Sequence, residues 1–155
     1  MAPRAYVAVG SNLGDRRAMM AKAQTLLETN PRISVRKVSG IYETDPVGFL
    51  AQGRFLNAVW ELETELPPDD LLNALLAVEK ELGRERKVKN GPRVIDLDLL
   101  AYDDYISERP ELTLPHPRLH ERYFVLKPFS DLNPEWVHPY LHRTVQELLS
   151  EVFCR

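Results

Sequence analysis

The chain has 155 residues, a formal net charge of -3, 44% hydrophobic residues and 28% charged residues. This length fits one domain with a single core. The acidic balance argues against broad, non-specific nucleic-acid binding, and no apolar run is long enough to span a membrane or act as a leader. The single cysteine, Cys154, allows no internal disulfide and favours a reducing compartment, so we expect a cytoplasmic protein.

The first 42 residues predict a strand, a helix and a second strand. Residues 5–9 form a short apolar run that is typical of a buried strand. The turn at residues 10–15 ends with Asp15, which is placed to cap a helix over residues 16–28. Residues 33–42 are rich in β-branched and aromatic side chains and therefore predict the next strand.

The following segment predicts a loop, a strand, a helix and another strand. Residues 43–54 contain a proline and two glycines and are expected to form a loop, whereas residues 55–63 alternate cleanly between two faces. The prolines and aspartates at 67–70 start a helix, and Gly83 is suited to end it. A basic segment then leads into a strand over residues 94–101.

This order of elements, β-α-β-β-α-β, predicts an α+β fold. Its expected core is ferredoxin-like, with an antiparallel sheet backed by two helices. The rest of the chain forms a C-terminal extension, for which we expect a hairpin turn at Asp103 and Asp104, a strand over 112–114 and helices over 117–126 and 144–153. No linker divides the chain, so we expect residues 1–155 to form a single domain.

Two carboxylates lie two residues apart within an apolar run. Because a strand alternates its faces, Asp96 and Asp98 point one way while Ile95, Leu97 and Leu99 point the other. Their Cα atoms are then about 7 Å apart. Such a pair occurs on the solvated face of an edge strand, but it also suits Mg²⁺, which takes one or two carboxylates and completes its shell with water and phosphate. We favour the metal site.

The segment before that strand, residues 84–93, is dense in positive charge. Charge runs are often only solvated surface, yet Arg93 leads directly into the aspartate strand and arginine forks match phosphate oxygens. A cationic loop beside a metal-ready strand therefore predicts a polyphosphate site. Neither a Walker A sequence nor a kinase glycine loop is present, so ATP would need another scaffold.

Three further features are weaker signals. His116 lies between two prolines and could donate to a phosphate, although its spacing alone favours an ordinary turn residue. The turn at 10–14 is similar to a phosphate-cradling loop, but a tight turn before a helix is an equal interpretation. Asn57 beside an aromatic residue would suit a flat, amide-rich heterocycle. The four histidines, His116, His120, His138 and His142, form no zinc pattern.

Together these features resemble the 6-hydroxymethyl-7,8-dihydropterin pyrophosphokinase family of folate biosynthesis, over nearly the whole chain. The resemblance rests on Gly10-Ser11-Asn12-Leu13-Gly14-Asp15, Tyr42-Glu43-Thr44, Phe55-Leu56-Asn57-Ala58, Gly91-Pro92-Arg93 with Asp96-Leu97-Asp98-Leu99-Leu100, and Leu114-Pro115-His116-Pro117. It implies transfer of the pyrophosphoryl group of ATP to the pterin hydroxymethyl oxygen, with release of AMP.

The resemblance also implies a set of site residues. ATP would be bound by Glu79, Arg84, Arg86, Lys87, Arg93, Leu99, Thr113, His116 and Arg122. The pterin would be bound by Thr44, Pro46, Val47, Phe55, Asn57, Asp96 and Phe124. Two Mg²⁺ ions would be held by Asp96 and Asp98. The substrates are then small molecules, and we expect no nucleic-acid, membrane or obligate protein partner.

Three positions depart from the family pattern. Asn90 stands where many members carry tryptophan, and the basic loop is a residue shorter than in some relatives. Arg118 stands where some relatives carry an aromatic residue after the histidine. These departures affect the alignment of the residues in the basic loop and the nucleotide contacts near His116.

The expected reaction is in-line attack by the substrate hydroxyl on the β-phosphorus of ATP. Arg84 and Arg93 would offset the charge that develops on the bridging oxygen, and Asp96 is the best candidate for a base. With Asp98, these are the predicted catalytic residues.

Two other functions stay open on the residues alone. Ferredoxin-like folds also serve as small-molecule sensors and RNA binders. An RNA binder should have a basic sheet surface, whereas this one would carry Asp96 and Asp98. A metal-dependent nuclease would also suit two carboxylates and arginines, but it should have further acidic ligands.

Overall fold

The computed structural model describes residues 2–45, 53–83 and 94–153. Within these ranges the chain folds around an antiparallel sheet with the strand order β2-β4-β1-β5, in which the short β3 also pairs with β4. The strands are β1 (Arg4–Ser11), β2 (Ile33–Val38), β3 (Tyr42–Thr44), β4 (Phe55–Thr64) and β5 (Asp96–Tyr102). The antiparallel sheet agrees with the predicted ferredoxin-like core, and the α+β prediction is confirmed.

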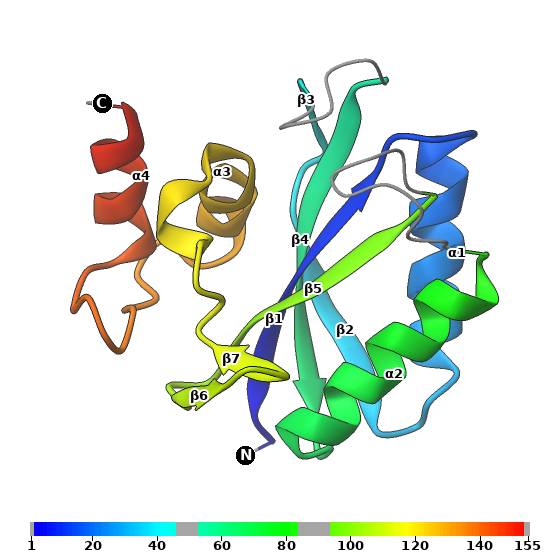
Figure 1. The fold of residues 1–155 in the computed structure, drawn as a ribbon, viewed down its shortest axis with the longest axis horizontal. Coiled ribbons are helices and arrows are strands. Elements are labelled where there is room, and N and C mark those ends of the chain that lie inside the picture. Colours follow the sequence, from blue (N-terminus) through cyan, green and yellow to red (C-terminus); the bar gives the residue numbers. More distant parts are fainter. Residues whose placement is uncertain (1, 46–52, 84–93, 154–155) are drawn as a thin grey trace.

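Helices lie on both sides of this sheet (Figure 1). The helices α1 (Arg16–Glu28) and α2 (Pro68–Glu81) pack on one side, and α3 (Tyr123–Leu132) and α4 (Val145–Phe153) lie on the other. Between β5 and α3 the chain forms a hairpin of β6 (Ser107–Arg109) and β7 (Leu112–Leu114), followed by a short 3₁₀ turn, Leu119–Glu121. None of the described helices is long and apolar enough to cross a bilayer.

Local chemistry explains where the helices begin and end. The Asp15 side chain accepts the backbone N–H of Ala18 at 3.1 Å, which caps α1 at the predicted residue. Gly83 follows α2 with φ +86°, a conformation that glycine adopts without steric cost. Thr144 and Glu147 exchange side-chain and backbone hydrogen bonds in a capping box at the start of α4.

The strand predicted over 94–101 begins two residues later, as β5 (Asp96–Tyr102), and two other predicted elements differ more in their boundaries. Residues 33–42 form two strands rather than one, because Ser39 ends β2 by accepting the Val59 N–H on its hydroxyl at 2.8 Å. The strand β3 then takes up Glu43 and Thr44, which were expected in a loop. The helix predicted over 117–126 begins only at Tyr123, because Arg122 is extended after the 3₁₀ turn, and it continues through Pro128 to Leu132.

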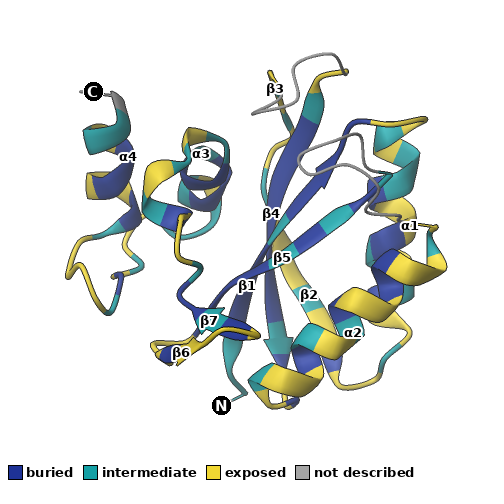
Figure 2. Ribbon diagram, viewed as in Figure 1, coloured by how far each residue is buried: buried dark blue, intermediate teal, exposed yellow. Residues whose placement is uncertain are grey.

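The alternation of the strands divides the sheet into two faces (Figure 2). The face toward α1 and α2 is apolar, and buried residues from β1, β4 and β5 meet the helices there: Val7, Val9, Ala58, Trp60, Leu62, Leu97 and Leu99. The opposite face packs against α3 and α4 at one end, through Tyr6, Val59, Leu100 and Phe129. Its other end is polar, and the candidate site lies there.

Candidate functional site

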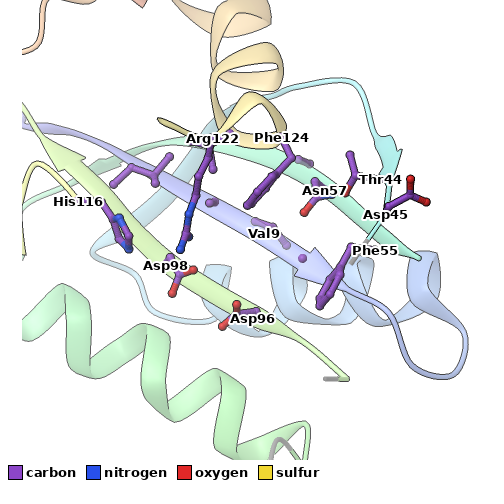
Figure 3. Close-up of a pocket in the computed structure, with 15 residues that line it drawn as sticks. Val9, Thr44, Asp45, Phe55, Asn57, Asp96, Asp98, His116, Arg122 and Phe124 are labelled. Atoms are coloured by element: carbon purple, nitrogen blue, oxygen red, sulfur yellow. Dashed lines mark hydrogen bonds between the residues drawn. The ribbon is translucent and has the colours of Figure 1, made fainter. Parts of the chain in front are cut away.

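Two cavities meet beside β5. The first, of about 100 Å³, lies on the polar end of the second sheet face, between the sheet, β3 and the start of α3 (Figure 3). The second, of about 280 Å³, lies between α2, β5 and the β6–β7 hairpin. Asp98 and His116 line both cavities. A ligand in one cavity can therefore approach a ligand in the other at these two side chains.

The floor of the first cavity carries the two aspartates. Asp96 and Asp98 pair across the sheet with Gly10 and Ala8 of β1, and these small residues leave room above the strand. A Cβ at Gly10 would lie 3.5 Å from Asn57 Oδ1, so a larger residue there would fill the space between the strands' side chains. The prediction that both carboxylates share one face is confirmed by their lining of this cavity.

The aspartate pair fits Mg²⁺ by the chemistry of its donors. Carboxylate oxygens are the ligands that Mg²⁺ prefers, and the ion commonly takes one or two of them with water and phosphate. Over residues 2–45, 53–83 and 94–153, no group of three or more His, Cys, Asp or Glu side chains is placed to hold a metal. The two carboxylates suit an ion whose shell is completed by water and phosphate.

His116 reaches this junction from the loop after β7. Its backbone N–H donates to Leu100 O at 2.8 Å, and its Nδ1 accepts the Arg118 N–H at 3.2 Å. Burial, and next the charge of Arg122, lower the pKa of His116 to about 4. The imidazole is therefore neutral near pH 7, and with Nδ1 acting as an acceptor the proton is on Nε2. Nε2–H is then a hydrogen-bond donor of the site.

The side of the first cavity away from His116 combines aromatic rings with an amide. The Asn57 Nδ2 donates to Thr44 Oγ1 at 2.5 Å, which fixes the orientation of the buried amide. The rings of Phe55 and Phe124 also line the cavity, and the Arg122 guanidinium lies 5.5 Å from the centre of the Phe124 ring. Fixed polar groups beside aromatic rings suit a flat ring that carries hydrogen-bonding edges.

The second cavity has a mixed lining. Leu99, Thr113 and Glu79 contribute to it, as the resemblance implied for the nucleotide. Glu79 is 3% exposed, and its Oε2 accepts the Leu97 N–H at 2.7 Å, which ties α2 to the edge strand β5. Leu72 and Leu76 also line this cavity and were not predicted. Leu72 and Leu76 are four residues apart and Leu76 and Glu79 are three apart, which places all three on one helix face and was a usable signal.

The described residues of both predicted sets are thus brought together around the two cavities. Thr44, Phe55, Asn57, Asp96, Asp98, His116, Arg122 and Phe124 line the first, and Glu79, Asp98, Leu99, Thr113 and His116 line the second. Pro46, Val47, Arg84, Arg86, Lys87 and Arg93 lie outside the described residues. Asp45 lines the first cavity and was missed. Its carboxylate forms an ion pair with Arg54 at 3.0 Å. The only sequence signal for Asp45 was its place directly after the Tyr42-Glu43-Thr44 motif.

Comparison with known proteins identifies the family. The protein-family model described as 7,8-dihydro-6-hydroxymethylpterin-pyrophosphokinase (HPPK) matches residues 6–134 of this chain. The chain belongs to this family. The pyrophosphokinase of folate biosynthesis that the motifs predicted is thereby confirmed, and with it pyrophosphoryl transfer from ATP to hydroxymethyldihydropterin. The binding-module and nuclease alternatives are set aside.

Two relatives support membership of the HPPK family. The 2-amino-4-hydroxy-6-hydroxymethyldihydropteridine pyrophosphokinase of Bacillus subtilis is 47% identical over 128 residues, which cover 83% of this chain and 77% of that protein. Folic acid synthesis protein fol1 of Schizosaccharomyces pombe is 43% identical over 148 residues, which cover 96% of this chain and 20% of that protein. This chain thus spans about a fifth of the fungal relative.

The fold is shared with a longer chain of known structure. The crystal structure of Plasmodium falciparum HPPK-DHPS A437G/K540E with pterin and p-hydroxybenzoate superposes with a TM-score of 0.80. The match covers 100% of this chain and 44% of that chain, at 15% sequence identity. At this sequence identity the likeness shows that the two chains share a fold, and no more.

Proposed function

We propose that this HPPK binds the pterin in the first cavity and ATP in the second, and transfers the pyrophosphoryl group where they meet. The observation that carries this proposal is the junction of the two cavities at Asp98 and His116. The first cavity has the amide, hydroxyl and aromatic groups that a flat heterocycle needs, and the second joins apolar helix residues to Glu79 and Thr113. The pterin, which accepts the pyrophosphoryl group, and ATP, which donates it, can therefore lie on either side of β5, the strand that bears the aspartates.

In this proposal Asn57 and Thr44 orient the pterin, and Phe55 and Phe124 hold its faces. Because the Asn57 side chain is already fixed by its bond to Thr44, it loses little conformational entropy when the pterin binds. Pro46 and Val47, which lie outside the described residues, complete the predicted pterin set. The hydroxymethyl group of the pterin would then point toward Asp96, on the β5 side of the cavity.

Asp96 and Asp98 would hold two Mg²⁺ ions, which when bound neutralise and orient the ATP phosphates. His116 donates its Nε2–H to a phosphate oxygen, and Arg122, held over Phe124, adds a cation on the same side. The substrate oxygen attacks the β-phosphorus as the bond from that phosphorus to the α-phosphate oxygen breaks, and AMP leaves. Asp96 would accept the hydroxyl proton.

The basic segment supplies the remaining positive charge in this proposal. Arg84 and Arg93 offset the charge that develops on the leaving oxygen, and Arg86 and Lys87 contact the polyphosphate. Both substrates are small molecules, and we place the activity in the cytoplasm in one domain over residues 1–155. The P. falciparum HPPK-DHPS has this fold within a longer chain.

The decisive experiment is AMP release from ATP with 6-hydroxymethyl-7,8-dihydropterin and Mg²⁺, for wild type, Asp98→Ala and Asp104→Ala. Asp104 lies in the exposed turn after β5 and serves as the matched control. We expect pterin-dependent AMP in the wild type and the control, and a loss of at least about 1,000-fold in Asp98→Ala, since metal stabilisation is worth several kcal/mol. AMP formation that Asp98→Ala leaves unchanged would contradict the metal assignment, and a folded wild type without AMP would contradict the function.

A further inference from the structure

A hydrogen-bonded link lies outside both cavities and joins β3 to α3. The Tyr42 hydroxyl donates to Asp131 Oδ2 at 2.6 Å, and the Gly40 N–H donates to the same oxygen at 3.1 Å. The two side chains are 89 residues apart in the chain. Neither lines a cavity, and the bonds lie at the exposed surface rather than in the core.

The two elements that this link joins carry opposite walls of the first cavity. Tyr42 and Thr44 are two residues apart in β3 and so share a face, and Tyr42 lies opposite Asn57 in the sheet register. Asp131 follows Phe124 by seven residues, which is about two turns of α3 and returns to the same helix face. The link therefore connects β3, whose Thr44 accepts the bond from Asn57, to the helix that holds Phe124.

The local backbone is built to receive the carboxylate. A Cβ at Gly40 would lie 3.3 Å from Asp131 Oδ2, so a side chain there would crowd the carboxylate, and it would touch the Tyr42 ring at 3.6 Å. Glycine allows the Gly40 N–H to approach the same oxygen that the hydroxyl occupies. Two donors from one turn thus converge on a single carboxylate oxygen, which fixes the position of α3 relative to β3.

We propose that Asp131, through Tyr42, is a positioning residue that sets the spacing between the Thr44 side and the Phe124 side of the pterin pocket. The proposal rests on the pterin assignment made above. Loss of the link lets α3 relax away from β3, so that the aromatic ring and the amide no longer fit the heterocycle at the same time. The second cavity is bounded by α2, β5 and the β6–β7 hairpin, none of which the link touches, so ATP binding should change less than pterin binding.

The test is steady-state kinetics of AMP release with each substrate varied, on Tyr42→Phe, Asp131→Ala and the double variant. We expect the KM for the pterin to rise about 3- to 10-fold in each single variant, because each variant loses one or two hydrogen bonds to a charged group. The KM for ATP and kcat stay within about twofold. The double variant should be no worse than Asp131→Ala, since both changes break the same link.

Two controls separate positioning from a general loss of folding. Tyr140→Phe removes a similar exposed bond, from the Tyr140 hydroxyl to Glu108, at a site away from the pocket, and should leave both KM values unchanged. Asp131→Asn keeps an oxygen that can accept from Tyr42 and should restore most of the pterin affinity. A structural role alone would lower the melting temperature without moving the KM of one substrate.

The inference is overturned if the wild type makes AMP and both single variants keep the wild-type KM for the pterin. It is equally overturned if both KM values and kcat change together with the melting temperature, because the link would then only support the fold. A folded wild type that makes no pterin-dependent AMP would instead contradict the proposed function. The two failures are therefore distinguished by the wild-type reaction.

Discussion

The two faces of the central sheet come from the same strands but carry different chemistry. The face toward α1 and α2 is apolar along β4, from Leu56 to Leu62, and is sealed by helices. The face toward α3 is apolar only at one end, where Tyr6 stacks on Phe129 with ring centres 4.5 Å apart, and becomes polar toward Asn57 and the aspartates. Residues on one face of the sheet thus stabilise the fold, whereas residues at the polar end of the other face line the site. Substitutions on the two faces should therefore change stability and activity separately.

The largest effect on stability is expected on the sealed face. Leu62 is fully buried there, so Leu62→Ala should lower the free energy of unfolding by about 2–5 kcal/mol through lost transfer energy and a residual cavity. The kcat of the folded fraction should not change. Urea unfolding and AMP release measured on the same samples test both parts.

Val38→Ala is the matched control for this prediction. Val38 lies on the edge strand β2 and is 52% exposed, so its truncation should change stability by less than about 0.5 kcal/mol. If Leu62→Ala instead lowered kcat at unchanged stability, the division of labour between the faces would be wrong.

A smaller effect is expected at the packed end of the second face. The buried Tyr6 hydroxyl donates to Glu61 at 2.7 Å and accepts from Asn133 Nδ2 at 3.1 Å, and burial with the nearby carboxylate raises the pKa of Tyr6 to about 12. Tyr6→Phe leaves the Asn133 amide without this acceptor and should cost about 1–2 kcal/mol. Urea unfolding measures the cost.

The Tyr6 variant also sharpens the contrast within the second face. AMP release with Tyr6→Phe should show wild-type KM values, because Tyr6 lies outside the lining of both cavities. Tyr105→Phe, at a residue that is 45% exposed, is the control for loss of a tyrosine hydroxyl and should be neutral. A raised KM for the pterin in Tyr6→Phe would show that the packed end and the polar end are mechanically coupled.

The features that could be predicted from the sequence are those that local rules determine. The placement of Asp96 and Asp98 on one face follows from strand alternation, and α1 has the predicted bounds because Asp15 caps it. The antiparallel α+β core followed from the order of the elements along the chain. The spacing of one helix face was present at Leu72 and Leu76, but no local pattern indicated that this face borders a cavity.

The features that could not be predicted depend on partners far away in the chain. The break between β2 and β3 arises because the Ser39 side chain takes a bond from Val59, twenty residues later. The bond from Tyr42 to Asp131 requires α3 to lie against β3, which no local pattern specifies. The low pKa of His116 likewise comes from burial and from Arg122, which only the folded chain brings close.

The smallest predicted effect concerns the loop between α3 and α4. The buried His138 accepts the N–H groups of Tyr140 and Leu141 on Nδ1 at 3.2 Å, and its ring lies 5.9 Å from that of Trp136, which packs on Phe129. Protonation of Nδ1 would replace an acceptor of two bonds by a donor. The loop therefore favours the neutral ring, and burial, with smaller contributions from neighbouring histidines, lowers the pKa of His138.

The pH dependence of stability should reveal this loop. Because the pKa of His138 is lower in the fold than in the unfolded chain, its contribution is present above the unfolded value of about 6.5 and is lost as the pH falls toward the folded pKa. Urea unfolding at pH 7.5 and 5.0 should show that the wild type has a lower free energy of unfolding at the lower pH. In His138→Asn this loss should be smaller, by less than about 1 kcal/mol, since Asn keeps an acceptor but does not titrate. His142→Asn, at an exposed position with φ 55° that asparagine tolerates, should keep most of the wild-type loss. Equal losses in wild type and His138→Asn would show that protonation of this loop does not weaken the extension that covers the second face.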